Sequence, residues 1–470
     1  MRNYARENRP WVIWLSIFAV IVVGVGIFFY YTLFRQSKSE LIEAIPTDAA
    51  FIFALNDNDA FVTGSASLTP YLNELFVLDA MPAYQTMRSK LPNGEYDLTV
   101  SGHTESDAIS VLFNMHADKA AFKRLLRALS IDPNNYIPFE NNRIYTYGTN
   151  FKSVKFVYLN HIISFSTDME LLKRAIVQHA HPKNLLSDKQ FKEIYNLSEK
   201  NRKQNWLIIN PQKYTPHFSS FLNEELAGKL AKCLDGGSWT ALQLRFSGND
   251  MYLSGYMLAE DASEKGFCRF LKAQKGDGTD LSELLPSTIN WYADVKNGCS
   301  CFSLSADSCD YHYYLTLNTS SDFLAELYGN ATSADSLRNA HPNGIYPVKE
   351  KFAPTMPNLA PDTMNWVFAF GQAVIFAPST EAVTQFQKTV KNKGTLNQNR
   401  YYPFVSDAVA SSSLYNFVIF HDETDTFWNS QLSDKGKASH FGQQMRIFSL
   451  SCDAVEKDQH LVPVNLYLHF

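Results

Sequence analysis

The sequence predicts an N-terminal single transmembrane helix followed by two related α+β domains with largely antiparallel sheets. Three observations predict this: one long uncharged apolar segment, an aromatic content of 14% that favours strands, and sequence patterns of the first half that recur in the second. A chain of 470 residues exceeds what one hydrophobic core usually organises, so more than one domain is expected. With 45% hydrophobic and 19% charged residues, the chain lacks the composition of a disordered protein.

The first element is an apolar segment near the N-terminus. Residues 11–34 carry no charge, with tryptophans at the start of the segment and tyrosines near its end. About 20 apolar residues suffice for a helix to cross the hydrocarbon of a bilayer, and aromatic side chains favour its two interfaces. We therefore predict a transmembrane helix at 11–34, preceded by a cytoplasmic tail at 1–10.

A cleaved signal peptide is the alternative for this segment. Its apolar core would be about 7–15 residues long and would end in small residues at a cleavage site. Here Arg35 and Lys38 follow the segment, so we expect an uncleaved anchor. Three arginines precede the span, and it is followed by one large body, so we expect the N-terminus inside and the body on the far side of the membrane.

The body begins with a segment that occurs twice. LIEAIPTDAAFIFAL, from Leu41, aligns with LSELLPSTINWYADV, from Leu281. Each segment has the pattern of a short helical turn, a proline stop at Pro46 or Pro286, and a strand.

A second pair of segments recurs at a spacing of 211 residues (372 − 161). HIISFSTDMELLKRAI, from His161, aligns with QAVIFAPSTEAVTQFQ, from Gln372, and each predicts a strand followed by a helix. The helices open with residues that favour the N-cap, among them Asp168 and Ser379. The apolar strands at 205–208 and 416–419 have the same spacing.

Each half then closes with two strands of alternating pattern, WTALQLRFS and MYLSGYMLA in the first, MRIFSLS and LVPVNLYLHF in the second. We therefore predict α+β repeats at 41–260 and 281–470, joined by a linker at 261–280. The alternative is that two strand-rich segments align in part by chance.

Within the first repeat, hydrophobic periodicity predicts helices at 70–89, 118–129, 170–179 and 189–200. It predicts strands near Phe51, Leu98, Ile109, Ile144, Val157, Ile163 and Ile208. Strands often follow one another without a helix, which favours antiparallel pairing over a doubly wound parallel sheet.

No sequence motif identifies a reaction. The chain lacks the H-E-x-x-H, G-x-S-x-G, S-x-x-K and G-x-x-x-x-G-K patterns, so no catalytic residue is assigned and neither a cofactor nor a metal is predicted. The net charge of −5 and the absence of clustered basic residues argue against a nucleic-acid partner.

The six cysteines leave several interpretations open. Cys268, Cys299, Cys301 and Cys309 lie close together in the sequence, and in an oxidising compartment one or two disulfides are plausible. Zinc is a weaker alternative because the chain has no C-x-x-C pair. Buried thiols are the third, above all for Cys233 and Cys452.

Two polar pairs resemble metal sites but favour roles at helix ends. His179 and His181 could bind a metal in an extended segment, but we expect them to close the preceding helix. Asp57 and Asp59 resemble the opening of a calcium loop that lacks its glycine and its closing glutamate. Helix capping by Asp57 or Asn58 is the expectation.

The anchor, the L-x-E-x-I-P-x-D-A-A-F motif and the two-copy plan together resemble a family of Bacteroidetes envelope proteins that contain a domain of unknown function. The motif includes Ile45, Pro46, Ala49, Ala50 and Phe51. The resemblance implies an inner-membrane protein whose body faces the periplasm, and it transfers no catalytic residue. In those bacteria the tripeptides at 335–337 and 362–364 would fit an O-glycosylation signal.

These observations favour a non-enzymatic, membrane-tethered periplasmic protein that binds another envelope component, either a protein or a glycan. One alternative is an envelope hydrolase that acts on a cell-wall polymer or lipid. Another is a chaperone or assembly factor for exported proteins. A hydrolase predicts a cleft with two acidic residues, whereas a binding protein predicts an apolar or aromatic surface.

Overall fold

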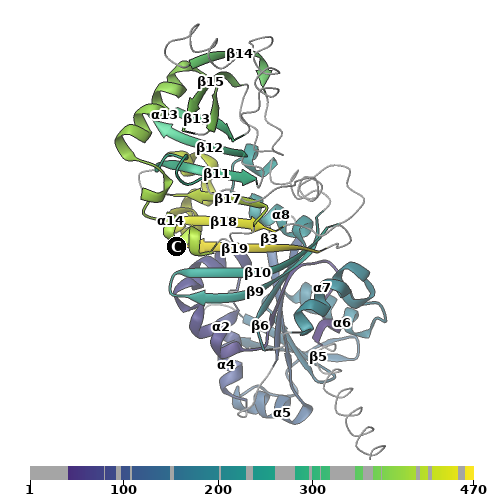
Figure 1. The fold of residues 1–470 in the computed structure, drawn as a ribbon. Coiled ribbons are helices and arrows are strands. Elements are labelled where there is room, and N and C mark those ends of the chain that lie inside the picture. Colours follow the sequence, from purple (N-terminus) through teal and green to yellow (C-terminus); the bar gives the residue numbers. More distant parts are fainter. Residues whose placement is uncertain are drawn as a thin grey trace, which may run out of the picture. The chain divides into compact units, whose positions relative to one another are not determined.

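The computed structural model describes residues 41–78, 80–91, 97–105, 108–148, 153–200, 203–228, 237–259, 281–295, 299–306, 309–317, 345–352, 364–371, 373–408, 413–421, 426–453 and 461–470. The predicted tail 1–10, transmembrane helix 11–34 and linker 261–280 lie outside these residues. Among the residues described, no helix is long and apolar enough to cross a membrane. The fold is α+β with antiparallel strand ladders, as the sequence predicts (Figure 1).

The strands of the first half are β1 (Ala49–Leu55), β2 (Leu98–Glu105), β3 (Ala108–His116), β4 (Ile137–Phe139), β5 (Asn142–Gly148), β6 (Ser153–Leu159), β7 (Ile162–Ser166), β8 (Trp206–Ile209), β9 (Gly237–Ser247) and β10 (Asp250–Ala259). Its helices are α2 (Asn58–Gly64), η1 (Ala66–Leu68), α3 (Thr69–Phe76), α4 (Met81–Ser89), α5 (Lys119–Ala128), α6 (Met169–Ala180), η2 (Leu185–Ser187), α7 (Lys189–Lys200) and α8 (Pro211–Ser219).

The strands of the second half are β11 (Ile289–Val295), β12 (Cys299–Ala306), β13 (Cys309–Thr316), β14 (Ile345–Phe352), β15 (Met364–Phe370), β16 (Ala373–Ala377), β17 (Tyr415–Phe420), β18 (Ile447–Cys452) and β19 (Leu461–His469). Its helices are α13 (Thr380–Lys393), η3 (Leu396–Gln398), α14 (Tyr402–Ala408), α15 (Thr426–Gln431), α16 (Asp434–Ala438) and α17 (His440–Gln444).

The chain divides into two compact units. Unit 1 comprises Met1–Thr47, Pro82–Thr99 and Leu112–Ser187, and unit 2 comprises Asp48–Met81, Val100–Val111 and Asp188–Phe470. The division does not coincide with the predicted repeats 41–260 and 281–470. The reason is that the closing strands of the two halves, β10 and β19, pair with each other inside unit 2.

Unit 1 is an antiparallel ladder of β5, β6, β7 and the second part of β3, with helices on both faces. Helix α6 packs on β6 and β7, where Leu171 and Ile176 join Val157 in one buried cluster. The opposite face carries α4 and α5, whose rings Tyr84 and Phe122 lie against Phe165 and Phe156. Both faces of this sheet are therefore covered.

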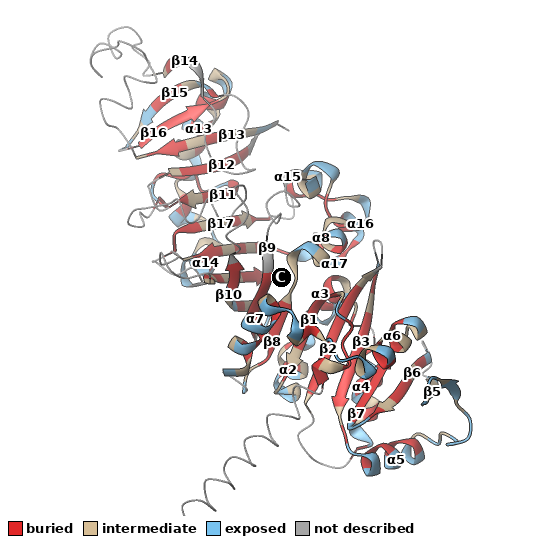
Figure 2. Ribbon diagram, turned by 90° about the vertical axis from the view of Figure 1, so that its right-hand side faces the viewer, coloured by how far each residue is buried: buried red, intermediate tan, exposed pale blue. Residues whose placement is uncertain are grey.

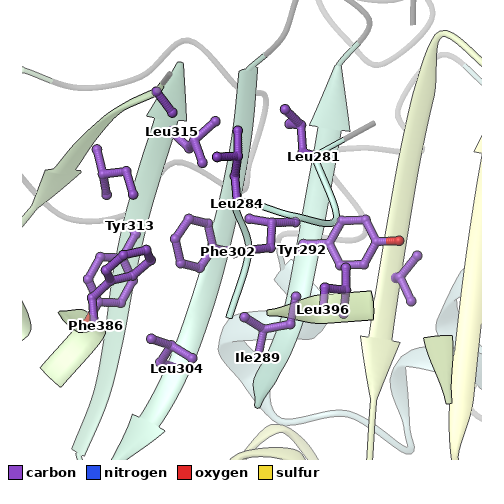
Figure 3. Packing of buried hydrophobic residues seen from close by; sticks show 14 of the residues in the cluster. Leu281, Leu284, Ile289, Tyr292, Phe302, Leu304, Tyr313, Leu315, Phe386 and Leu396 are labelled. Atoms are coloured by element: carbon purple, nitrogen blue, oxygen red, sulfur yellow. The ribbon is translucent and has the colours of Figure 1, made fainter. Parts of the chain in front are cut away.

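Unit 2 contains one long antiparallel ladder, in the order β2, β1, β8, β9, β10, β19, β18, β17, β11, β12, β13, β16, β15, β14. Its strands are largely buried, whereas helices such as α16 keep an exposed face (Figure 2). Around α13, the stacked rings of Phe302 and Tyr313 contact Phe386 of the helix (Figure 3). The Tyr313 hydroxyl donates to Ala382 O at 2.8 Å, and burial raises its pKa far above the ordinary value.

The predicted capping residues do begin α6 and α13. Asp168 accepts hydrogen bonds from the backbone N–H groups of Glu170 and Leu171 at the start of α6. Ser379 accepts one from Ala382 N at the start of α13. The predicted helices 118–129, 170–179 and 189–200 agree with α5, α6 and α7 within two residues.

The single helix predicted at 70–89 was wrong. The structure has two helices there, α3 and α4, because Val77 adopts a left-handed conformation with φ of 51° and its N–H bonds to Asn73 O. Pro82 then stands in the first turn of α4, where a missing N–H is tolerated. Pro82 was the sequence signal for the break, since a proline in a helix interior removes a hydrogen bond.

Candidate functional site

The most distinctive site in unit 2 is an apolar cavity of about 290 Å³, partly open to solvent. Its floor is formed by one face of β8, β9, β10, β19 and β18, and its roof by side chains of α3, α8 and α17. In Figure 2, α3, α8 and α17 lie together beside this part of the ladder. The site therefore combines strands that are more than two hundred residues apart in the sequence.

The floor follows from the registers of four strand pairs. Residues directly opposite each other in antiparallel strands share a face. One row across five strands consists of Leu207, Leu242, Gly255, Val464 and Cys452. Four of these five line the cavity.

The next two rows continue the apolar surface. Leu253, Leu466 and Leu450 form one of them. Met251, Leu468 and Phe448 form the other. Because side chains alternate along a strand, every second side chain of β10, β19 and β18 lies on this face. Together these side chains form one wide apolar surface.

Gly255 is the position of the floor where the backbones of β9 and β10 approach closely. It lies between Leu253 and Met257 on the cavity face of β10 and contributes no side chain. A Cβ at this position would approach Ala241 O to 1.9 Å, so the backbone of β9 leaves no room for another residue. Close strand packing therefore fixes glycine at the centre of the floor.

The roof is held by polar contacts that leave no group available to the cavity. The Tyr214 hydroxyl of α8 donates to Leu75 O of α3 at 2.8 Å, and Thr215 Oγ1 donates to Pro211 O at 2.6 Å. Burial raises the pKa of the Tyr214 phenol far above its ordinary value. The other roof residues are apolar: Leu75, Phe76, Pro211, Phe218 and Phe441.

Helix α17 is attached to α3 by one carboxylate. Glu74 of α3 accepts hydrogen bonds from His440 N at 2.8 Å and Phe441 N at 2.9 Å, and its Oε1 lies 2.8 Å from His440 Nδ1. Tyr71, one turn earlier on α3, donates to Gln444 at the other end of α17. These contacts position Phe441 over the cavity.

The lining has no carboxylate, imidazole, ammonium or guanidinium group. Its titratable side chains are the Tyr214 phenol and the Cys452 thiol. Proton transfer at a reacting centre requires a positioned group with a suitable pKa. The arrangement can retain an apolar molecule, but it supplies no acid–base pair.

A second cluster in unit 2 has the hydrogen-bond order of a serine-hydrolase triad. Ser101 Oγ lies 3.0 Å from His103 Nε2, and His103 Nδ1 lies 2.9 Å from Asp48 Oδ1. Ser101 and His103 are both 0% exposed, whereas the Asp48 side chain is 45% exposed. The buried hydroxyl offers no path for a substrate. Sequence analysis missed this cluster, although a Ser-x-His pair on a strand was its available signal.

The residues singled out in the sequence have ordinary structural roles. Asp57 caps α2 by accepting from Ala60 N, as expected, and Asp59 lies in the first turn of the helix. His179 lies in the last turn of α6, and His181 is its C-cap, which confirms the predicted helix end. Among the side chains that the structure describes, no group of three or more His, Cys, Asp or Glu could hold a metal ion.

The disulfide alternative is not realised at the three cysteines whose thiols the structure describes as free, Cys299, Cys301 and Cys452. Cys299 and Cys301 are free thiols on β12, and burial raises the pKa of the Cys301 thiol. Cys452 is buried in the cavity floor. Cys233 and Cys268, the tripeptide 335–337 and most of 362–364 lie outside the described residues, and the side chain of Cys309 is not described.

No protein-family model matches this chain, and no curated protein matches it. Among solved structures, it is similar to crystal form I of TP0453, with a TM-score of 0.26 and 13% identity over 47% of this chain and 80% of that chain. Crystal form III of TP0453 gives a TM-score of 0.26 and 14% identity over 53% and 87%. A likeness at this level establishes neither a common fold nor a function.

Replacing Glu74 by alanine should loosen α17. The variant loses two hydrogen bonds to a charged acceptor, so we expect the free energy of unfolding to fall by about 1.5–3 kcal/mol. Amide hydrogen exchange at His440 and Phe441 should become faster. Denaturant unfolding and exchange mass spectrometry measure the two effects.

Asn73→Ala on the same helix is the control, because Asn73 is exposed and its side chain takes no part in the α17 contacts. Its unfolding free energy should stay within about 0.5 kcal/mol of wild type. Equal exchange rates in the Glu74 variant and wild type would show that the carboxylate does not hold the roof.

Proposed function

We propose that this chain is a membrane-tethered periplasmic protein that binds another component of the cell envelope without catalysing a reaction. The observation that carries the proposal is the apolar cavity of unit 2, whose lining has no acid–base pair. A concave, mostly apolar site of this size is typical of small-ligand binding.

The tether is the predicted helix 11–34, with residues 1–10 in the cytoplasm and the body in the periplasm. Its support is the uncharged sequence itself and the arginines that precede it. A tether would keep the cavity close to the lipids and membrane proteins of the envelope.

We further propose that the body arose by duplication, as repeats 41–260 and 281–470. Neighbouring strands of the first half run β5, β6, β7, β3, β2, β1, β8, β9, β10, and those of the second run β14, β15, β16, β13, β12, β11, β17, β18, β19. If β4 is left out and the strands of each half are numbered in chain order, the two halves have the same order of neighbouring strands. If the two halves resembled each other only by chance, all eight successive pairs of neighbouring strands would have to agree by chance.

The pairing of the two closing strands supports the same spacing. Ser254 of β10 lies opposite Asn465 of β19, and the two are 211 residues apart (465 − 254). The caps Asp168 and Ser379 are also 211 residues apart (379 − 168). A local twofold relation between β10 and β19 would therefore pass through the Ser254–Asn465 pair.

The partner predicted from the sequence is an envelope protein or a glycan. A glycan would bring hydroxyl groups into a lining whose Tyr214 and Thr215 hydroxyls already donate within the protein. A protein could insert apolar side chains, which also suits an assembly factor. The cavity therefore favours apolar ligand groups over a sugar.

The compartment is tested by a reporter joined to Phe470 through a flexible linker. We expect alkaline phosphatase to be active there, because this enzyme needs the oxidising periplasm. If only a reporter that works in the cytoplasm were active at this position, both the tether topology and the periplasmic location would be contradicted.

The binding function is tested by filling the cavity. We expect full-length protein, cross-linked in cells and purified, to retain a component that mass spectrometry identifies, and Leu466→Trp to lower its yield at least ten-fold. Leu466 is only partly buried, so the larger ring should be tolerated in the fold.

Tyr256→Trp is the matched control, because Tyr256 is on the opposite face of β10 and 41% exposed. The component should be recovered from this variant as from wild type. Equal recovery from all three proteins would mean that the cavity is not the binding site.

A hydrolase remains the second candidate function, favoured by the Asp48–His103–Ser101 chain of hydrogen bonds. A fluorophosphonate probe reacts with activated serines, and burial of Ser101 leads us to expect no labelling of the folded protein. Labelling of wild type that disappears in Ser101→Ala would instead establish the hydrolase.

A further inference from the structure

We propose that the cavity of unit 2 binds one long acyl chain of an amphiphile, with the polar head group left outside in water. This inference rests on the proposed binding function and names its ligand class. It is argued from the polarity, size and opening of the cavity.

Polarity excludes ligands with many hydrogen-bonding groups. The roof hydroxyls of Tyr214 and Thr215 are both engaged within the protein, and the rest of the lining is aliphatic, aromatic or sulfur-containing except for Thr240 of β9. A peptide main chain or a sugar would lose its hydrogen bonds to water and gain none. A hydrocarbon chain has no such groups to satisfy.

Size sets the length of chain that fits. A volume of about 290 Å³ equals roughly ten water-sized units at about 30 Å³ each. A methylene group is of similar size to water, so roughly ten carbons of an acyl chain would fill the space. Water inside an apolar lining finds few hydrogen-bond partners, so a hydrocarbon chain can displace it at little cost.

The lining suits a flexible chain better than a rigid ring system. Met251 and Met257 are unbranched, and their side chains can follow different chain conformations. They lie on β10 on either side of Gly255. The floor can thus adapt along the direction of the strand.

The opening assigns the place of the head group. Tyr214, Phe218, Phe448 and Leu466 line the cavity and are partly exposed, so the cavity reaches the surface beside them. A carboxylate or phosphate head group would remain hydrated at this mouth. The opening therefore leaves room for the head group of an amphiphile.

The test uses full-length protein held in peptide discs without added lipid. One sample receives palmitic acid with a diazirine near the end of its chain, and a second receives phosphatidylethanolamine with the same group on one acyl chain. After illumination, mass spectrometry locates the label. We expect it on peptides of β10 and β19 that contain Leu253 and Leu466.

Leu466→Trp should lower this labelling at least ten-fold, and Tyr256→Trp should leave it unchanged. Leu253→Trp is a second cavity-filling variant, in case Leu466→Trp does not fold. Labelling by both probes, or by either one alone, supports the acyl chain and identifies its source. Labelling of the same peptides at the same level in every folded variant would overturn the proposal.

Unlabelled fatty acids of increasing length give an independent readout as competitors. The affinity of the competing fatty acid should rise by about four-fold per added methylene until roughly ten carbons are buried, and then stay constant. Competition that does not depend on chain length would also overturn the proposal.

The two functional proposals can fail separately. If neither probe labels the cavity while cross-linking in cells still captures a component that Leu466→Trp loses, the acyl chain is wrong and the binding function stands. If nothing is captured and no probe labels the cavity, both are wrong.

Discussion

The pairing of β10 with β19 is the interaction on which the rest of unit 2 depends. It runs through nine residue pairs, from Asp250 opposite His469 to Leu258 opposite Leu461. It joins strands from the two halves of the chain into one floor and sets which side chains face the cavity. A shift by one residue would turn the apolar positions of one strand to the other face, so hydrophobic burial strongly specifies this register.

The helices that form the roof of the cavity are held in place by hydrogen bonds among themselves. Glu74 and Tyr71 hold α17 through hydrogen bonds to His440, Phe441 and Gln444, and Tyr214 joins α8 to α3 through its hydrogen bond to Leu75 O. Core side chains normally pack to the density of a crystal, and an empty apolar volume forfeits contacts on its walls. The polar contacts therefore hold α8 and α17 over the apolar floor, where packing of the roof against the floor alone would bring them closer.

Local patterns predicted most elements but could not predict the site. Caps such as Asp168 and the alternation of the closing strands are encoded within a few residues, and these predictions were confirmed. The break at Val77 is not evident from periodicity, because the apolar pattern continues across it and a left-handed valine has no sequence signature; only Pro82 marks the start of a new helix. Each cavity residue, for example Leu253 or Leu466, has the pattern of an ordinary core residue in its own strand. Only the long-range register brings them together, and no local signal reports that register.

If the body is a duplication, the site depends on where its two copies differ. A twofold relation through Ser254 and Asn465 would equate Gly255 with Leu466, and Leu253 with Val464, at the spacing of 211 residues (466 − 255, 464 − 253). Identical copies would place equal side chains at equivalent positions and fill or empty both sides of the floor alike. With glycine on one strand and leucine on the other, the backbone of β9 approaches β10 closely at Gly255, while Leu466 contributes a side chain to the cavity lining. The sequence difference between the copies, rather than the fold they share, would then make the two sides of the floor unequal.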